Sequence, residues 1–354
     1  MSGGSVYQRA DGYWAAAVAV GGKRVVRYAK TERAAKGVLE ELQRTHYLGT
    51  LSAPTKVTVR EWVAQWLEWQ STRLRPSSLT AYERVVALLL PHVGHLRLDR
   101  LTAPAVALAF SKLERAKVGR RTVEQAYTYF HGCIERAVTL GMLGSNVVSK
   151  VPRPSAQSED RAQWTLADMQ RFLAATDTAD TRYAPLFVVL LGTGLRISEA
   201  LGLRWADVDL AAPTVTVRRG VVWVGAQHSV QPPKSRAGAR TLTLPPFAVA
   251  ALNRLPRALH SDSPVFCTET DTLPATGNLR RALRRVCAVA GVPYVGLHGL
   301  RHAHASVLVA SGVDIKTAQK RLGHSSVALT LNVYAHALGA DSGAASAVGR
   351  VLEA

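Results

Sequence analysis

Two stretches rich in proline, glycine and small polar residues, at 48–56 and 151–163, divide this chain of 354 residues into three segments. Such stretches are typical of linkers, because proline and glycine interrupt both helices and strands. A chain of this length is also expected to form two or three domains, since one domain commonly holds about 100–200 residues. We therefore expect domains at 1–50, 56–152 and 160–354.

The first segment has the pattern of a small β-sheet followed by one helix. Glycine-containing turn signals separate three β-prone runs, at 6–9, 13–20 and 23–28. Thr31 then stands where a helix N-cap is expected, ahead of an apolar stripe at helical spacing. The third run carries three basic residues, Lys23, Arg24 and Arg27. They suit a DNA-binding surface, and they equally suit an edge strand that is protected by charge.

The second segment has the pattern of a helical bundle. Helix-start signals stand at Thr58, Pro76, Thr102 and Thr122, and the second helix should run to about Leu90 and stop before Pro91. At Thr58 the signal is a capping box, because a glutamate follows three residues later. Apolar residues recur at helical spacing after these starts, which predicts several helices packed around one core.

The third segment combines helical patterns with a short β region, at 214–224 and 240–244. Taken together, the three segments predict a mainly helical protein of the α+β class. Its expected parts are a three-stranded sheet with one helix, a helical bundle, and a mostly helical domain with a small antiparallel sheet.

The charge balance indicates a polyanionic partner. Lysine and arginine total 44 and aspartate and glutamate total 25, so the formal net charge is +19. Nucleic acid is the usual partner of so basic a protein, because each neutralised phosphate releases condensed counterions. Charge alone leaves open a merely basic enzyme that binds no nucleic acid.

Cysteine usage and hydropathy indicate a cytosolic protein with no membrane partner. The three cysteines, Cys133, Cys267 and Cys287, have no Cys-x-x-Cys spacing, so neither a disulfide framework nor a zinc module is expected. The N-terminus has no apolar run like that of a signal peptide, and no apolar run is long enough to span a bilayer.

Five short motifs in the third segment carry groups that are suited to phosphate chemistry. In chain order their key residues are Arg196 in TGLRISE, Lys234 in PKSRAGAR, His298 and Arg301 in HGLRH, His324 in LGH, and Tyr334 in NVYAH.

The two arginines are suited to a phosphorane-like transition state, because a planar guanidinium matches the non-bridging oxygens of phosphate. Arg196 should lie at a helix start after a turn at 192–194. Glu199 lies on the same helical face, where it either orients Arg196 or forms an ordinary surface ion pair. His298 and Arg301 are three residues apart, so one helix face should present both.

Tyr334 is a candidate nucleophile, although a tyrosine on an apolar helix can also be a core residue. A phenol has a pKa near 10, so it needs cationic neighbours or a base to react at neutral pH. Lys234 suits a general acid, and its Pro- and Gly-rich context is typical of a β-hairpin loop. His324 follows a Leu-Gly break and suits a phosphate hydrogen bond, whereas His304 and His336 are interpreted as structural.

At these motifs the sequence resembles the tyrosine recombinase, or phage integrase, family. The resemblance covers about 161–336, and the three-part layout is similar to that of integrases with arm-binding, core-binding and catalytic domains. It implies that Tyr334 forms a 3′-phosphotyrosine and that Lys234 protonates the 5′-hydroxyl that leaves. It also implies that Arg196, His298, Arg301 and His324 contact the scissile phosphate. Neither a metal nor ATP is implied, because the phosphotyrosine conserves the bond energy.

The resemblance also implies partners and a biological role. Double-stranded DNA attachment sites are the expected substrate, and four protomers are expected to assemble on two sites to integrate or excise a mobile element. An accessory DNA-bending or directionality protein and association with the nucleoid fit the same role. Four arginines could add phosphate contacts or form a solvated helix face: Arg280, Arg281, Arg284 and Arg285.

Three alternatives stay open on the sequence. His298 and His302 have the spacing of a helical zinc pair, but Gly299 stands where a metalloprotease needs glutamate, and Arg301 would repel a cation. The second alternative is a DNA-binding regulator without catalytic activity, whose basic surface would be the same. The third is a type IB topoisomerase-like enzyme with the same covalent chemistry.

Overall fold

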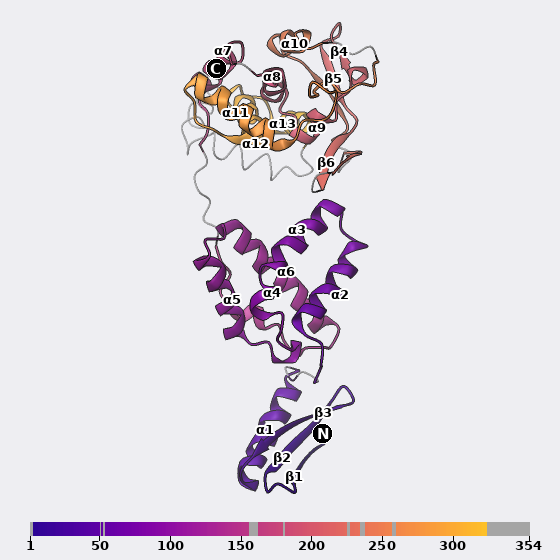
Figure 1. Ribbon diagram of the computed structural model, residues 1–354, viewed down its shortest axis with the longest axis vertical. Helices are drawn as coiled ribbons and strands as arrows, with labels where there is room; N and C mark the ends of the chain where they lie inside the picture. The colour runs from indigo at the N-terminus through magenta and orange to yellow at the C-terminus, as the bar shows by residue number, and fades with distance from the viewer. Residues whose placement is uncertain are drawn as a thin grey trace, which may run out of the picture. The chain divides into compact units, whose positions relative to one another are not determined.

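The computed structural model describes residues 3–49, 51, 54–155, 162–179, 181–224, 227–233, 238–256 and 260–323 (Figure 1). The chain divides into two compact units, Met1–Ser158 and Glu159–Ala354. The described residues contain three separate hydrophobic clusters, two in the first unit and one in the second. Within the described residues, no helix is long and apolar enough to cross a membrane.

The N-terminal residues form a three-stranded antiparallel sheet that packs on one helix (Figure 1). Its elements are β1 (Gly4–Gln8), β2 (Trp14–Val20), β3 (Lys23–Ala29) and α1 (Glu32–Tyr47). Gly21 and Gly22 join β2 to β3 with φ values of 53° and 75°, which a two-residue hairpin turn requires. Thr31 caps α1 as predicted, since its side chain accepts a hydrogen bond from the Ala34 amide at 3.2 Å.

The rest of the first unit is helical. Its elements are α2 (Val59–Ser71), α3 (Pro76–Ala87), α4 (Leu90–Val93), the 3₁₀ turn η1 (Leu98–Arg100), α5 (Ala103–Arg115), α6 (Arg120–Thr139) and η2 (Val147–Lys150). The capping box at Thr58 is present, because the side chains of Thr58 and Glu61 bond each other's backbone amides. The large apolar residues of these helices share one core, which is the packing predicted for this segment.

Two helix boundaries in this segment differ from the prediction. The helix that begins at Pro76 ends at Ala87, and Pro91 lies inside the first turn of the short helix α4, where its missing N–H costs nothing. The cap of α6 is Gly119 and not Thr122, because Gly119 has a non-helical backbone and the amide of Thr122 donates to its carbonyl at 2.8 Å. Thr122 therefore lies in the first turn of the helix.

The second unit is mostly helical, with two small antiparallel sheets. Its helices are α7 (Leu166–Ala175), α8 (Ala184–Thr193), α9 (Ile197–Leu201), α10 (Pro246–Asn253), α11 (Thr276–Ala290), α12 (Gly296–Ala310) and α13 (Ile315–Leu322), with the 3₁₀ turn η3 (Trp205–Asp207). Its strands are β4 (Val208–Asp209), β5 (Thr214–Val217), β6 (Gly220–Val224), β7 (Gln227–Gln231) and β8 (Arg240–Thr243). The predicted α+β class is confirmed.

Helix α8 is the centre of this unit. All its residues from Leu186 to Thr193 are buried, and it packs against α10 and α12. A helix that is apolar all round is stable only inside a core. Packing on all sides therefore holds the C-terminal end of α8, and with it the start of the chain that leads to α9.

The prediction of a β-hairpin loop around Lys234 is wrong. Strand β7 pairs with β6, whereas β8 pairs with β5 in a different sheet. The segment between Gln231 and Arg240 consequently connects two sheets. Lys234 itself lies outside the described residues.

Candidate active site

A glycine turn at the end of α8 sets the position of Arg196. Gly194 has a φ of 69°, and a Cβ there would lie 2.5 Å from Cδ2 of His304, so both the backbone and the packing require glycine. Gly192 and Thr193 complete α8, so the predicted turn is shorter and consists of Gly194 and Leu195. Arg196 follows as the N-cap residue of α9, at the helix start where it was expected.

Glu199 binds Arg196 in a pair whose carboxylate is buried. The backbone amide of Arg196 donates to Oε2 of Glu199 at 3.0 Å, and its Nη1 donates to Oε1 at 2.7 Å. The side chain of Glu199 is only 7% exposed, against 36% for Arg196. An ordinary surface ion pair is therefore excluded, and Glu199 orients the guanidinium of Arg196.

Arg240, at the start of β8, binds the same carboxylate. Its Nη2 donates to Oε2 of Glu199 at 3.0 Å. Burial alone would raise the pKa of Glu199, but the hydrogen bonds and charge of Arg240, and then the bonds from Arg196, hold this pKa below its ordinary value. Glu199 is therefore ionised at neutral pH, and two guanidinium groups share its charge.

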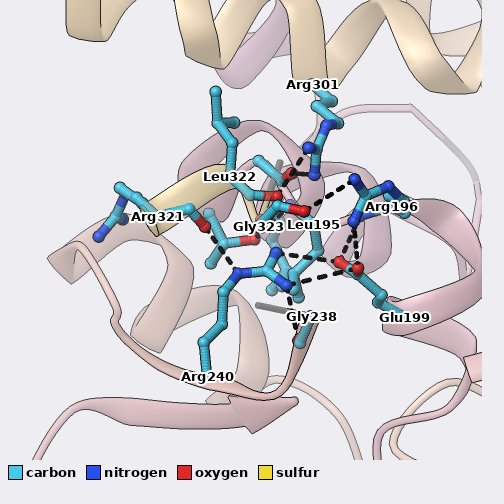
Figure 2. Close-up of polar contacts among 12 residues, drawn as sticks. Leu195, Arg196, Glu199, Gly238, Arg240, Arg301, Arg321, Leu322 and Gly323 are labelled. Carbon is cyan, nitrogen blue, oxygen red and sulfur yellow. Dashed lines mark hydrogen bonds and ion pairs between the residues drawn. The ribbon is translucent and has the colours of Figure 1, made fainter. Parts of the chain in front are cut away.

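Three arginines also hold the C-terminus of α13 (Figure 2). Three consecutive backbone carbonyls at this end each accept a hydrogen bond from a different guanidinium. The pairs are Arg240 Nε with Arg321 O at 2.7 Å, Arg301 Nη2 with Leu322 O at 2.7 Å, and Arg196 Nη2 with Gly323 O at 3.0 Å. Carbonyls at a helix C-terminus lack intrahelical partners and carry partial negative charge, so they are suitable acceptors for cations.

Arg301 is the most deeply buried of the three cations. The residue is 3% exposed, and its Nη1 donates to the carbonyl of Gly194 at 2.7 Å. Burial, and then the charge of Arg196, lowers the pKa of Arg301 to about 9. The group is still protonated at neutral pH. Because the cluster holds three guanidiniums and only one carboxylate, Glu199, it has excess positive charge, which favours a bound anion.

His304 supports this cluster from the core. Its Nδ1 lies 2.9 Å from the carbonyl oxygen of Leu191, and its Nε2 lies 3.1 Å from Nε of Arg321. A guanidinium only donates, so Nε2 is the acceptor and Nδ1 carries the proton. Burial, and then the charge of Arg321, lowers the pKa of His304 to about 4. These contacts fit the structural interpretation of this histidine.

Acid is expected to destabilise the second unit through His304. The pKa of this histidine is about 4 in the folded chain, against an ordinary value of 6.5. Between these values the unfolded state binds more protons, so stability is full above about pH 6.5 and falls toward pH 4. The loss is on the order of 3 kcal/mol. Urea unfolding of the full chain at several pH values between 4 and 7.5 measures it.

The matched pair of variants for this prediction is His304→Gln and His95→Gln, because His95 is exposed. His304→Gln should reduce the decline in unfolding free energy with acid, whereas His95→Gln should leave it unchanged. If the unfolding free energy of the His304→Gln variant depended on pH in the same way as that of the unchanged chain, His304 would not be the source of the acid-induced loss.

The structure brings only part of the predicted site together. Arg196 and Arg301 meet at the end of α13, immediately before His324 in the chain. His298 and Arg301 lie three residues apart on α12, where His298 is exposed and Arg301 is buried. His324 and Tyr334 lie outside the described residues, as does Lys234.

The metal-site alternative rests on His298 and His302 of α12. The rings of His298 and His302 meet edge to face, with centroids 4.8 Å apart. Among the residues that the structure describes, no group of three or more His, Cys, Asp or Glu side chains could hold a metal ion.

Sequence reasoning missed the roles of Arg240 and Arg321. Arg240 contacts Arg321, which is 81 positions away, and Arg321 contacts Gly192, which is 129 positions away. No local pattern predicts such contacts. The available signal for Arg240 was its position as the last residue of the PKSRAGAR motif that contains Lys234.

Comparison with known proteins identifies the family. Residues 164–340, half of the chain, match the family described as the phage integrase family. The chain belongs to this family. Residues 58–108 also match the N-terminal SAM-like domain of phage integrases. The resemblance seen in the sequence is therefore confirmed.

Curated relatives agree with this membership. The chain is 24% identical to a tyrosine recombinase XerC-like protein of Caldanaerobacter subterraneus subsp. tengcongensis, over 88% of this chain and 87% of that protein. It is 24% identical to the ICEBs1 integrase of Bacillus subtilis over 62% of each chain. It is 29% identical to the tyrosine recombinase XerC of Mycobacterium leprae, over 68% of this chain and 80% of that one. The predicted enzyme class, a tyrosine-type site-specific DNA recombinase, is confirmed.

Solved structures share the fold. The Tn1549 transposon integrase, solved in complex with a circular intermediate DNA, matches 84% of this chain and 100% of its own, with a TM-score of 0.72 and 19% identity. A lambda integrase dimer bound to a core site matches 93% of this chain and 94% of its own, with a TM-score of 0.61 and 15% identity.

Proposed function

We propose that this chain cleaves and rejoins DNA at the attachment sites of a mobile element, through a 3′-phosphotyrosine formed at Tyr334. The observation that carries the proposal is the convergence of three guanidiniums on the last carbonyls of α13, directly before His324 in the chain. A buried cluster with excess positive charge is preorganised for a phosphate whose negative charge grows in the transition state.

In the proposed reaction, the phenolic oxygen of Tyr334 gives up its proton to His298 and attacks the scissile phosphorus, and the bond from phosphorus to the 5′-oxygen breaks. Lys234 protonates this oxygen, which leaves as a 5′-hydroxyl. Arg196, Arg301 and His324 stabilise the non-bridging oxygens, and exposed His298 contributes a further hydrogen bond to the phosphate. A 5′-hydroxyl from the partner duplex then attacks the phosphotyrosine and releases Tyr334. The number of phosphoester bonds is conserved, so the reaction needs neither ATP nor a metal cofactor.

The same proposal assigns roles to the three expected domains. Residues 1–50 bind arm-type DNA, and the basic residues of strand β3 contact it. Residues 56–152 bind the core site, and residues 160–354 carry the catalytic residues. DNA complexes of related folds support double-stranded DNA as the partner. A lambda integrase tetramer bound to a Holliday junction supports a homotetramer on two sites. The protein is proposed to act in the cytoplasm, at the nucleoid. An accessory protein that bends DNA or sets the direction of recombination is proposed as a further partner.

The test is incubation of the full chain with supercoiled plasmid that carries two candidate attachment sites, in EDTA and without ATP. Relaxed plasmid, joined recombinant products and covalent protein–DNA adducts are expected. Activity that EDTA abolishes would support a metal enzyme. DNA binding without adducts would support a non-catalytic regulator, and relaxation without recombinants would support a topoisomerase-like enzyme.

Lys234→Ala is expected to slow cleavage about 10²–10⁴-fold, the usual contribution of a general acid. On a substrate whose 5′-bridging oxygen is replaced by sulfur, the variant should cleave at nearly the rate of the unchanged chain. A thiolate is a far weaker base than an alkoxide and leaves without a proton. A defect of equal size on both substrates would contradict the role of Lys234.

A further inference from the structure

Arg240 joins the parts of the arginine cluster. Its guanidinium contacts the Glu199 carboxylate through Nη1 and Nη2, at 3.4 and 3.0 Å, and the Arg321 carbonyl through Nε at 2.7 Å. A further bond runs from Nη1 to the carbonyl of Gly238 at 3.0 Å. Figure 2 shows this side chain directed toward Glu199 and the end of α13. One side chain therefore links α9, α13 and the start of β8.

We propose that Arg240 is a positioning residue for strand cleavage, which holds Glu199 and the C-terminus of α13 in one fixed geometry. The inference rests on the proposed function. Through Glu199 it fixes the direction of the Arg196 guanidinium, and through the Arg321 carbonyl it fixes the backbone that leads into His324. The Arg196 guanidinium and the end of α13 are thereby held in one geometry.

The contacts of Arg240 exclude a direct role at the phosphate. Arg301, which is assigned to the phosphate, donates two hydrogen bonds within the described residues, whereas Arg240 donates four. The bonds of Arg240 to Glu199, Arg321 and Gly238 use four of the five N–H donors of a guanidinium. Arg240 therefore acts through other residues and is not a catalytic residue.

Lysine cannot replace Arg240 in this geometry. A guanidinium is a rigid plane whose donors point in several directions, and here it binds a carboxylate along one edge and a carbonyl on another. An ammonium group places its three donors around a single nitrogen atom. Arg240→Lys therefore preserves the charge of the cluster and removes the link between Glu199 and α13.

The experiment compares Arg240→Lys with Arg219→Lys in the full chain. Arg219 is the matched control because its Nη1 binds another buried carboxylate of the same unit, Asp207, at 2.5 Å. Single-turnover cleavage is measured on the attachment-site substrate, and each rate is normalised to the protein that is bound to DNA. We expect the Arg240→Lys rate to fall about 10²-fold, the size associated with a misplacement of about 1 Å. Arg219→Lys should cleave close to the rate of the unchanged chain.

The substrate with 5′-bridging sulfur distinguishes two possible roles of Arg240. Arg240 either positions the groups that bind the phosphate or assists the general acid Lys234. The Arg240→Lys defect should persist on this substrate, whereas the Lys234→Ala defect should disappear. Arg240→Gln, which retains hydrogen-bonding capacity, is tested in parallel and should show the same persistent defect with DNA affinity retained.

Three results would overturn the inference: cleavage by Arg240→Lys at the control rate, a defect that disappears on the sulfur substrate, or loss of DNA binding in both Arg240 variants. The last would assign Arg240 to folding alone. If the proposed function is wrong, the result differs from all three. The unchanged chain and the Arg219→Lys variant would then form no adduct.

Discussion

Tyr334→Phe is expected to abolish covalent protein–DNA adducts while leaving DNA affinity close to that of the unchanged chain. The substitution removes the oxygen atom that attacks phosphorus in the proposed reaction, and it keeps the aromatic ring. All the basic residues that contribute to the net charge of +19 remain, so the electrostatic part of DNA binding persists. Adducts are measured on a denaturing gel, and affinity is measured by electrophoretic mobility shift at one stated salt concentration.

Tyr294→Phe is the control for this prediction. Tyr294 lies in the same unit, where its ring stacks under the guanidinium of Arg284 at 4.7 Å, and removal of its hydroxyl preserves that contact. The control should form adducts at the rate of the unchanged chain. Adduct formation by the Tyr334→Phe variant at an undiminished rate would exclude Tyr334 as the nucleophile.

Arg301→Lys is expected to lower the single-turnover cleavage rate about 10²–10³-fold, the cost of losing one preorganised donor to the transition state. Arg301 donates at 2.7 Å to both Gly194 and Leu322, and one ammonium group cannot reproduce this planar arrangement. DNA affinity should change little, because many other phosphate contacts contribute to it. Rates at saturating protein and dissociation constants for DNA are the two measurements.

The control for this second prediction is Arg171→Lys, since Arg171 is a half-exposed arginine of α7 that pairs with Asp168. Its cleavage rate should match that of the unchanged chain. Equal rates for Arg301→Lys and Arg171→Lys would contradict the assignment of Arg301 to the transition state.

Features that depend on a few neighbouring residues were predictable from the sequence. The capping box at Thr58, the N-cap at Thr31 and the glycine turn between β2 and β3 are all present in the structure. Each is a contact within about one helical turn or one hairpin, so the residues that make it are adjacent in the sequence.

Errors arose where local signals compete. Thr122 is a good N-cap residue, but the preceding arginines are good helix formers, and α6 begins at Arg120. Proline and glycine around Lys234 were interpreted as a hairpin, yet these residues equally suit a connection between sheets. The pairing of β8 with β5 is not encoded near either strand.

The arginine cluster could be predicted only in part. Its motifs identified Arg196 and Arg301, because guanidiniums suit phosphate and the spacing is typical of the family. The burial of Glu199, the contacts of Arg240 and the three bonds to the end of α13 depend on residues that are distant in the sequence. Tertiary packing around α8 brings them together, and no spacing rule describes it.

The most direct test of the account is chemical identification of the protein–DNA linkage. Adducts formed in EDTA are digested with nuclease and protease, and the modified peptide is sequenced by mass spectrometry. We expect a nucleotide joined through its 3′-phosphate to the oxygen of Tyr334, with a free 5′-hydroxyl on the cleaved strand. A linkage to another residue, a 5′-phosphate linkage, or adducts that form only with a divalent metal would contradict it.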